Sequence, residues 1–143
     1  MTDTRSWGIT LARVAVGTVF LVHGAQKLFV YHFSGVAQSF GQMGIPLPGL
    51  SAVVVTLVEF FGGLALILGL GTRVAAALIA IEMIGAIVLV HGKNGFFLPT
   101  GFEYAFTLLL VNAGLVLTGA GALALDNLFG RKDTAEVRAI RAA

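Results

Sequence analysis

Four long hydrophobic segments, separated by short polar connections, dominate the pattern along the chain. They cover residues 7–31, 50–70, 73–90 and 102–123. Each is close to the roughly 20 apolar residues that a helix needs to cross the hydrocarbon core of a bilayer. The pattern therefore predicts an all-α fold: a four-helix bundle, integral to a membrane, within a single domain of residues 1–130.

The connections between these segments differ in length. Gly71 and Thr72 leave room only for a tight turn between the second and third segments. The connection of residues 32–49 is the longest, and its two prolines, Pro46 and Pro48, stop helix continuation. Its first part carries apolar residues at helical spacing, namely Phe33, Val36, Ala37 and Phe40. We expect a short interfacial helix there, covering the outer mouth of the bundle.

Positive charge is distributed unevenly between the two sides of the predicted bundle. With four spans, both termini share one side with the turn between the second and third segments. That side carries Arg5, Arg73 and the basic tail of residues 131–143, whereas the other side carries Lys27 and Lys93. Cytoplasmic loops are enriched in Lys and Arg, so both termini are predicted to be cytoplasmic. Anionic lipid, rather than nucleic acid, is the expected partner of the tail.

Composition supports a membrane protein and excludes two redox mechanisms. Of the 143 residues, 57% are hydrophobic and only 11% are charged, whereas soluble domains carry about 25% charged residues. The chain has no cysteine, which excludes thiol–disulfide exchange and iron–sulfur ligation by thiolates. Within the apolar segments, no histidine or carboxylate pair has the i, i+3 or i, i+4 spacing of a helical metal site, so no metal is expected.

The tetrad Leu-Val-His-Gly occurs twice, at residues 21–24 and 89–92, near the ends of the first and third segments. This favours a repeat of two helical hairpins related by an axis along the membrane normal. Such a repeat would place His23 and His91 at similar depth. Chance similarity between apolar segments is the alternative that stays open.

Charged residues interrupt the apolar segments. Arg13, Glu59 and Glu82 lie within them, and Glu103 lies at the edge of the fourth. A charge near the bilayer centre costs at least a few kcal/mol, so we expect these groups to face the protein interior and to be partnered. Helical phase and rise allow His23 to pair with Glu59, and Arg13 to pair with Glu59 or Glu82.

The candidate site combines the polar residues of the outer half with Arg13, a counter-charge from the inner half. Glu59 and His23 are the predicted catalytic, proton-handling residues. The predicted ligand-binding residues are Arg13, Gln26, Lys27, His91 and Glu103. A structural role is the alternative for each: a buried acid that sets helix packing, a snorkelling arginine, or a hydrogen-bonded interfacial histidine. Glu82 is assigned no role.

Several motifs together resemble those of the DoxX family. They are Arg13, the segment 23–28, Glu59 with residues 62–64, the segment 69–73, the segment 91–104 and the segment 124–126. They occur in the family's order over nearly the whole chain. The resemblance implies a four-helix protein of the bacterial inner membrane, similar to the membrane subunit of thiosulfate:quinone oxidoreductase. Other members are linked to oxidative-stress responses together with soluble redox enzymes.

The predicted function is that of a quinone-interacting component of a membrane redox system, an oxidoreductase subunit if the chain is an enzyme. His23, Gln26 and Lys27 would donate hydrogen bonds to the quinone carbonyls, and Glu59 would carry protons. Electrons would come from a bound substrate or a partner protein. Two alternatives stay open: a non-catalytic scaffold whose tail docks soluble redox enzymes, and a small-solute carrier. Exposed Gly and Ala faces would allow a homo-oligomer.

Overall fold

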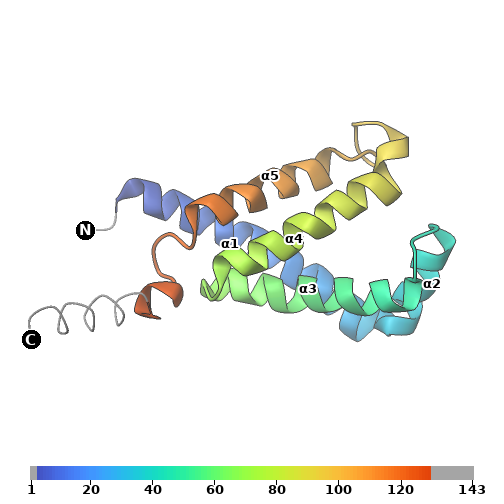
Figure 1. The fold of residues 1–143 in the computed structure, drawn as a ribbon, viewed down its shortest axis with the longest axis horizontal. Coiled ribbons are helices and arrows are strands. Elements are labelled where there is room, and N and C mark those ends of the chain that lie inside the picture. The colour runs from blue at the N-terminus through green and yellow to red at the C-terminus, as the bar shows by residue number, and fades with distance from the viewer. Residues whose placement is uncertain (1–2, 130–143) are drawn as a thin grey trace, which may run out of the picture.

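The computed structural model describes residues 3–129, and every regular element among them is helical (Figure 1). The α-helices are α1 (Thr4–Ala25), α2 (His32–Gln42), α3 (Pro48–Leu68), α4 (Thr72–Ala86) and α5 (Glu103–Thr118). π-Helical turns, Gln26–Tyr31 and Ile87–His91, continue α1 and α4, and a short 3-10 turn, Gly92–Asn94, follows the second. The prediction of an all-α fold is confirmed for this part of the chain.

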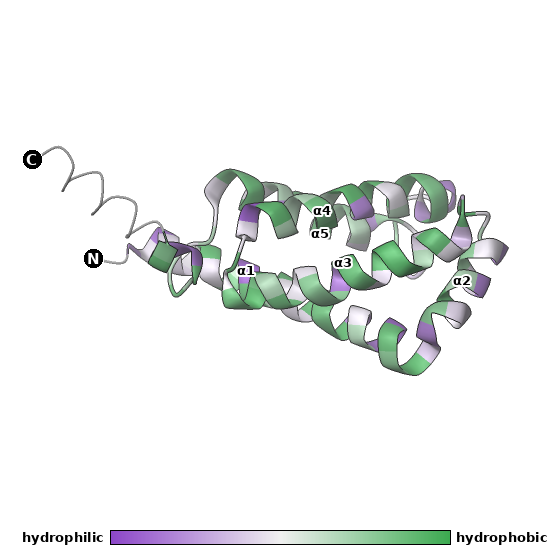
Figure 2. Ribbon diagram, turned by 60° about the horizontal axis from the view of Figure 1, so that its bottom comes forward, coloured by the Kyte–Doolittle hydropathy of each residue, from purple (hydrophilic) through white to green (hydrophobic). Residues whose placement is uncertain are grey.

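Three of the helical stretches are long and apolar enough to cross a membrane. They are Thr4–Gln42, Pro48–Leu68 and Thr72–Asn94, and α5 is a shorter apolar helix. α5 is also shorter than the predicted segment 102–123. Gly119 and Gly121 adopt positive φ angles of 82° and 71° and end the helix. Hydrophobic residues cover most of the helix surfaces (Figure 2), as lipid contact requires.

The helices pack as two pairs, with α1 along α3 and α4 along α5 (Figure 2). Glycines allow the first pair to approach closely. A Cβ atom on Gly63 would lie 2.8 Å from the carbonyl oxygen of Gly17, and one on Gly24 would lie 2.6 Å from the Cα of Phe60. Only glycine fits such backbone contacts, which are typical of helix pairs in membranes. The close approach determines which residues of α1 and α3 can meet.

α2 lies where the sequence predicts a short helix. It packs against α3 and buries Val36, a member of the predicted apolar face. The chain then turns through residues 43–47 and enters α3 with Pro48 in its first turn, where proline needs no amide hydrogen. Phe40, Met43 and Ile45 of this region form one wall of the cavity described below.

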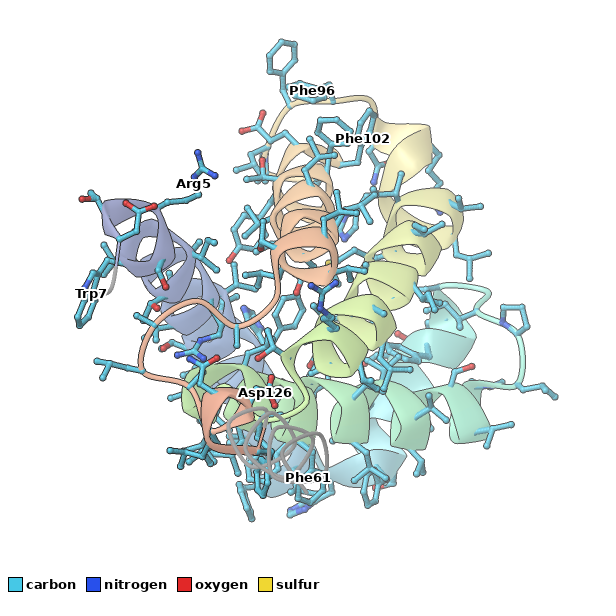
Figure 3. All side chains as sticks on the ribbon, turned by 60° about the vertical axis from the view of Figure 1, so that its left-hand side comes forward. Arg5, Trp7, Phe61, Phe96, Phe102 and Asp126 are labelled. Carbon is cyan, nitrogen blue, oxygen red and sulfur yellow. The ribbon has the colours of Figure 1, made fainter. Side chains whose placement is uncertain are left out.

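The chain after α5 folds back across the end of the bundle that holds the N-terminus (Figure 1). Ala122 donates its N–H to the carbonyl of Ser6. The carboxylate of Asp126, which is labelled in Figure 3, accepts hydrogen bonds from the backbone N–H groups of Gly71 and Thr72, at 2.6 and 3.0 Å. Burial alone would raise the pKa of Asp126, but these hydrogen bonds, with help from Arg13, hold it below its usual value. This segment therefore caps the start of α4.

Candidate functional site

A cavity of about 510 Å³ lies between the two helix pairs, toward the end that carries α2. Its walls are mainly apolar and come from all four of the long helices and from α2. The polar side chains on its surface are His23, Lys27, Ser51, Glu59, Glu82, His91 and Tyr104. A few polar groups in an apolar cavity of this size are typical of a small-molecule site.

An ion pair lies on the side of this cavity formed by α1 and α3. Lys27 lies in the π-helical turn after α1, and its Nζ is 2.5 Å from Oε2 of Glu59 in the middle of α3. The Lys27 side chain is 20% exposed and that of Glu59 only 7%. Each charge compensates the other, which a buried charge requires in a low-dielectric interior. The sequence places His23 beside Glu59, but the structure places Lys27 there, because its longer side chain reaches the carboxylate.

Glu82 of α4 faces this ion pair from the second helix pair. It lies within electrostatic reach of both Glu59 and Lys27. Its Oε2 atom is buried and receives no hydrogen bond from a donor among the described residues, and its carboxyl group lies within hydrogen-bond reach of that of Glu59. Glu82 has no role predicted from the sequence. The sequence signal for its place in the site was the helical face that it shares with Ala86 and Leu89. Both of these residues line the cavity in the structure.

Three further titratable side chains lie at the edges of the cavity. His91 is half-buried, and its Nδ1 is 3.2 Å from the carbonyl oxygen of Thr100. His23 and Tyr104 are exposed. The two histidines come from corresponding positions of the duplicated tetrad and line the same cavity. The repeat itself stays a prediction.

Arg13 lies elsewhere, and its predicted pairing with Glu59 or Glu82 is wrong. The side chain is 1% exposed and donates from Nη2 to the carbonyl of Leu123 at 3.0 Å. Asp126 is the carboxylate that acts on it electrostatically. The physical reason is the fold of the segment after α5, which brings an acceptor and an acid to Arg13 at the N-terminal end of the bundle. Asp126 belongs to the segment 124–126, which resembles a motif of the DoxX family. That resemblance was the only sequence signal that Asp126 has a structural or functional role.

Two more predicted site residues lie outside the cavity lining. Gln26 is exposed, and Glu103 is partly exposed at the start of α5. The structure thus brings together part of the predicted site, namely His23, Lys27, Glu59 and His91, and adds Glu82 to it. It leaves out Arg13, Gln26 and Glu103.

Comparison with known proteins agrees with this architecture. The chain is 40% identical over 119 residues to a Bacillus subtilis (strain 168) protein named "Putative oxidoreductase CatD", covering 83% of this chain and 84% of CatD. It is 31% identical over 130 residues to the Escherichia coli (strain K12) inner membrane protein YqjF, covering 87% and 94%. It is 29% identical over 130 residues to the inner membrane protein YphA of the same organism, covering 82% and 87%. No solved structure matches the chain.

The family assignment follows from a match that contains the whole ion-pair region. The DoxX family pattern matches residues 8–92, from α1 to the end of the π-helical turn after α4. Lys27, Glu59, Glu82 and His91 all fall within the matched residues. The relatives' names and the apolar helices confirm the predicted location in the bacterial inner membrane. The chain belongs to the DoxX family, and it is a multi-pass protein of that membrane.

Proposed function

We propose that the chain is a quinone-binding component of a membrane redox system and that its cavity holds the quinone headgroup. The Lys27–Glu59 ion pair inside an apolar cavity is the observation that carries the proposal. A quinone headgroup is an apolar ring with two carbonyl acceptors, so it suits apolar walls with few donors. The ammonium of Lys27 has three N–H donors, and Glu59 takes one of them. The others are available to a quinone carbonyl.

The same cavity contains groups able to carry protons. Reduction of a quinone to a quinol takes up two electrons and two protons. Glu59, Glu82 and His23 all line the cavity and are of the residue types that transfer protons near neutral pH. The electrons would come from a soluble redox partner, because the chain has no cysteine with which to form a redox-active thiol pair. The oxidoreductase name of CatD supports this chemical class.

A binding titration tests the proposal. The purified protein, reconstituted in lipid nanodiscs, would be titrated calorimetrically with a short-chain ubiquinone. Replacing Lys27 removes a charged hydrogen-bond donor worth about 1.5–3 kcal/mol, so Lys27→Gln should bind at least about tenfold more weakly. Lys93→Gln is the matched control, because Lys93 is exposed in the 3-10 turn after α4 and outside the cavity lining. Its affinity should equal that of the unchanged protein.

One complication has a direct remedy. Lys27→Gln leaves Glu59 without its partner inside the protein, which itself destabilises the fold. The double variant Lys27→Gln/Glu59→Gln removes both charges and keeps the shape of the pair. It should fold and still bind the quinone weakly. Full affinity in a folded Lys27 variant would refute the proposal.

The docking hypothesis depends on the basic tail, residues 131–143, which lies outside the described residues. It stays a prediction from charge, and the homo-oligomer stays a prediction from exposed Gly and Ala faces. The carrier hypothesis concerns the same cavity and differs in outcome, because a carrier would move its ligand across a sealed vesicle membrane. Binding without movement would favour the redox component.

A further inference from the structure

The charges that meet in the cavity do not balance if both of its central carboxyl groups are ionised. The titratable groups around Glu82 are His23, Lys27, Glu59, His91 and Tyr104. His91 is directed to a backbone carbonyl, and His23 is exposed at the edge. Lys27 is therefore the cation beside the two carboxyl groups.

That single cation is already engaged. Its Nζ contacts Oε2 of Glu59 at 2.5 Å, which makes a neutral pair. A second negative charge on Glu82 would lie within hydrogen-bond reach of the first, and residues 3–129 place no further cation beside it. Two carboxyl groups that share a site cannot both ionise without a large electrostatic cost. The middle of a membrane span raises that cost, since bulk water is not available to solvate the charge.

The hydrogen bonding of Glu82 is also incomplete. Its Oε2 is buried without a partner among the described residues. An ionised oxygen in that position would lack both a donor and a counter-charge. A protonated Glu82 can instead share its proton with the Glu59 carboxylate, which lies within hydrogen-bond reach, and can donate it to a carbonyl acceptor when a ligand supplies one. The cavity next to Glu82 has the volume for one.

We infer that Glu82 is a neutral carboxylic acid whose O–H is the hydrogen-bond donor that the cavity presents to one carbonyl of the quinone; the donor role rests on the proposed function. The cavity then contains Lys27 as a cation, Glu59 as an anion and Glu82 as a neutral acid. Its net charge is zero. Such a site accepts an uncharged carbonyl compound and has no spare positive charge to compensate an anionic ligand.

Infrared spectroscopy tests the charge state without any ligand. In nanodiscs at pH 7, the protein should show the C=O stretching band of a protonated carboxyl group, and Glu82→Gln should lose that band. Asp3→Asn, which changes an exposed acid, should keep it. A spectrum in which Glu82→Gln removes no protonated-acid band overturns the inference.

Titration with short-chain ubiquinone tests the donor role. Glu82→Gln keeps a neutral donor, so its affinity should stay within about threefold of the unchanged protein, whereas Glu82→Leu should bind about tenfold more weakly. The infrared band should also shift when the quinone binds. Equal losses in the Gln and Leu variants would overturn the donor role.

The two tests separate this inference from the function on which it rests. If the unchanged protein binds no quinone, the proposed function and the donor role both fail, and the infrared band still decides whether Glu82 is neutral. If quinone binds but Glu82 is ionised, the proposed function stands and this inference fails. Should Glu82→Leu not fold, the near-isosteric Gln variant decides the charge state by itself.

Discussion

Replacing Gly24 by alanine should destabilise the protein by separating α1 from α3. The added Cβ would lie 2.6 Å from the Cα of Phe60, whereas carbon atoms in contact lie about 3.5–4.0 Å apart. The helices must therefore move apart by about 1 Å at this level. Overpacking of this kind costs about 1–3 kcal/mol. Phe60 directly follows Glu59 in α3, so moving the two helices apart also disturbs the ion pair between Glu59 and Lys27.

The same substitution elsewhere in α1 gives a matched control. A Cβ on Gly8 would meet no atom within 4 Å. Gly8→Ala should therefore stabilise α1 slightly, by about 0.5–1 kcal/mol, since glycine in a helix is less favourable than alanine. The two variants have the same chemistry and opposite predicted signs.

Thermal unfolding in detergent micelles would measure the difference. Gly24→Ala should lower the Tm by several degrees, and Gly8→Ala should leave it unchanged or raise it. If Gly24→Ala is as stable as Gly8→Ala, the backbone contact between α1 and α3 is wrong, and with it the geometry that brings Lys27 to Glu59.

Three further predictions concern residues outside the ion pair. The pKa of Asp126 is lower in the folded than in the unfolded state. The ionised carboxylate therefore stabilises the folded state fully at neutral pH, and this stabilisation is lost as the pH falls through the folded-state pKa. The Tm difference between the unchanged protein and Asp126→Asn should shrink in acid. Thr10 donates to the carbonyl of Ala122 at 2.7 Å, so Thr10→Val should cost about 1 kcal/mol in chemical unfolding. Asn112 is buried, and within residues 3–129 it donates only to Leu108 of its own helix and leaves Oδ1 unpartnered. Asn112→Leu should therefore keep or raise the Tm, and a marked loss would contradict this.

The sequence predicts the helical fold well because membrane spans leave a local signal. A run of about 20 apolar residues is sufficient evidence for a spanning helix, whatever surrounds it. The end of the last helix was harder to predict. Residues 119–123 are as apolar as the helix before them, and only the left-handed conformation of Gly119 and Gly121 ends it.

The candidate site was predictable only in part, because it depends on how each helix is rotated about its own axis. Glu59 and Lys27 could be placed at the outer half from depth alone. Their contact required the close approach of α1 and α3 at the glycines. The charge of Glu82 predicted that its face of α4 is turned to the protein interior, but no local pattern shows which residues meet that face, so no role could be assigned to it.

Arg13 illustrates the limit of helical phase most clearly. Phase places it on the same face of the first helix as Lys27, and both could serve a carboxylate. Their partners differ because the chain after α5 folds back and brings Leu123 and Asp126 to Arg13. More than 100 residues separate these partners from Arg13 in sequence, and no local pattern encodes such a contact.

A structure of the protein with bound quinone is the most direct test of the account. The protein would be reconstituted with excess ubiquinone and its density map determined. We predict a quinone ring in the cavity between the Lys27–Glu59 ion pair and Glu82. One quinone carbonyl should lie within hydrogen-bond distance of Lys27 and the other within hydrogen-bond distance of Glu82. A cavity filled by lipid acyl chains, with the quinone elsewhere or absent, would contradict it.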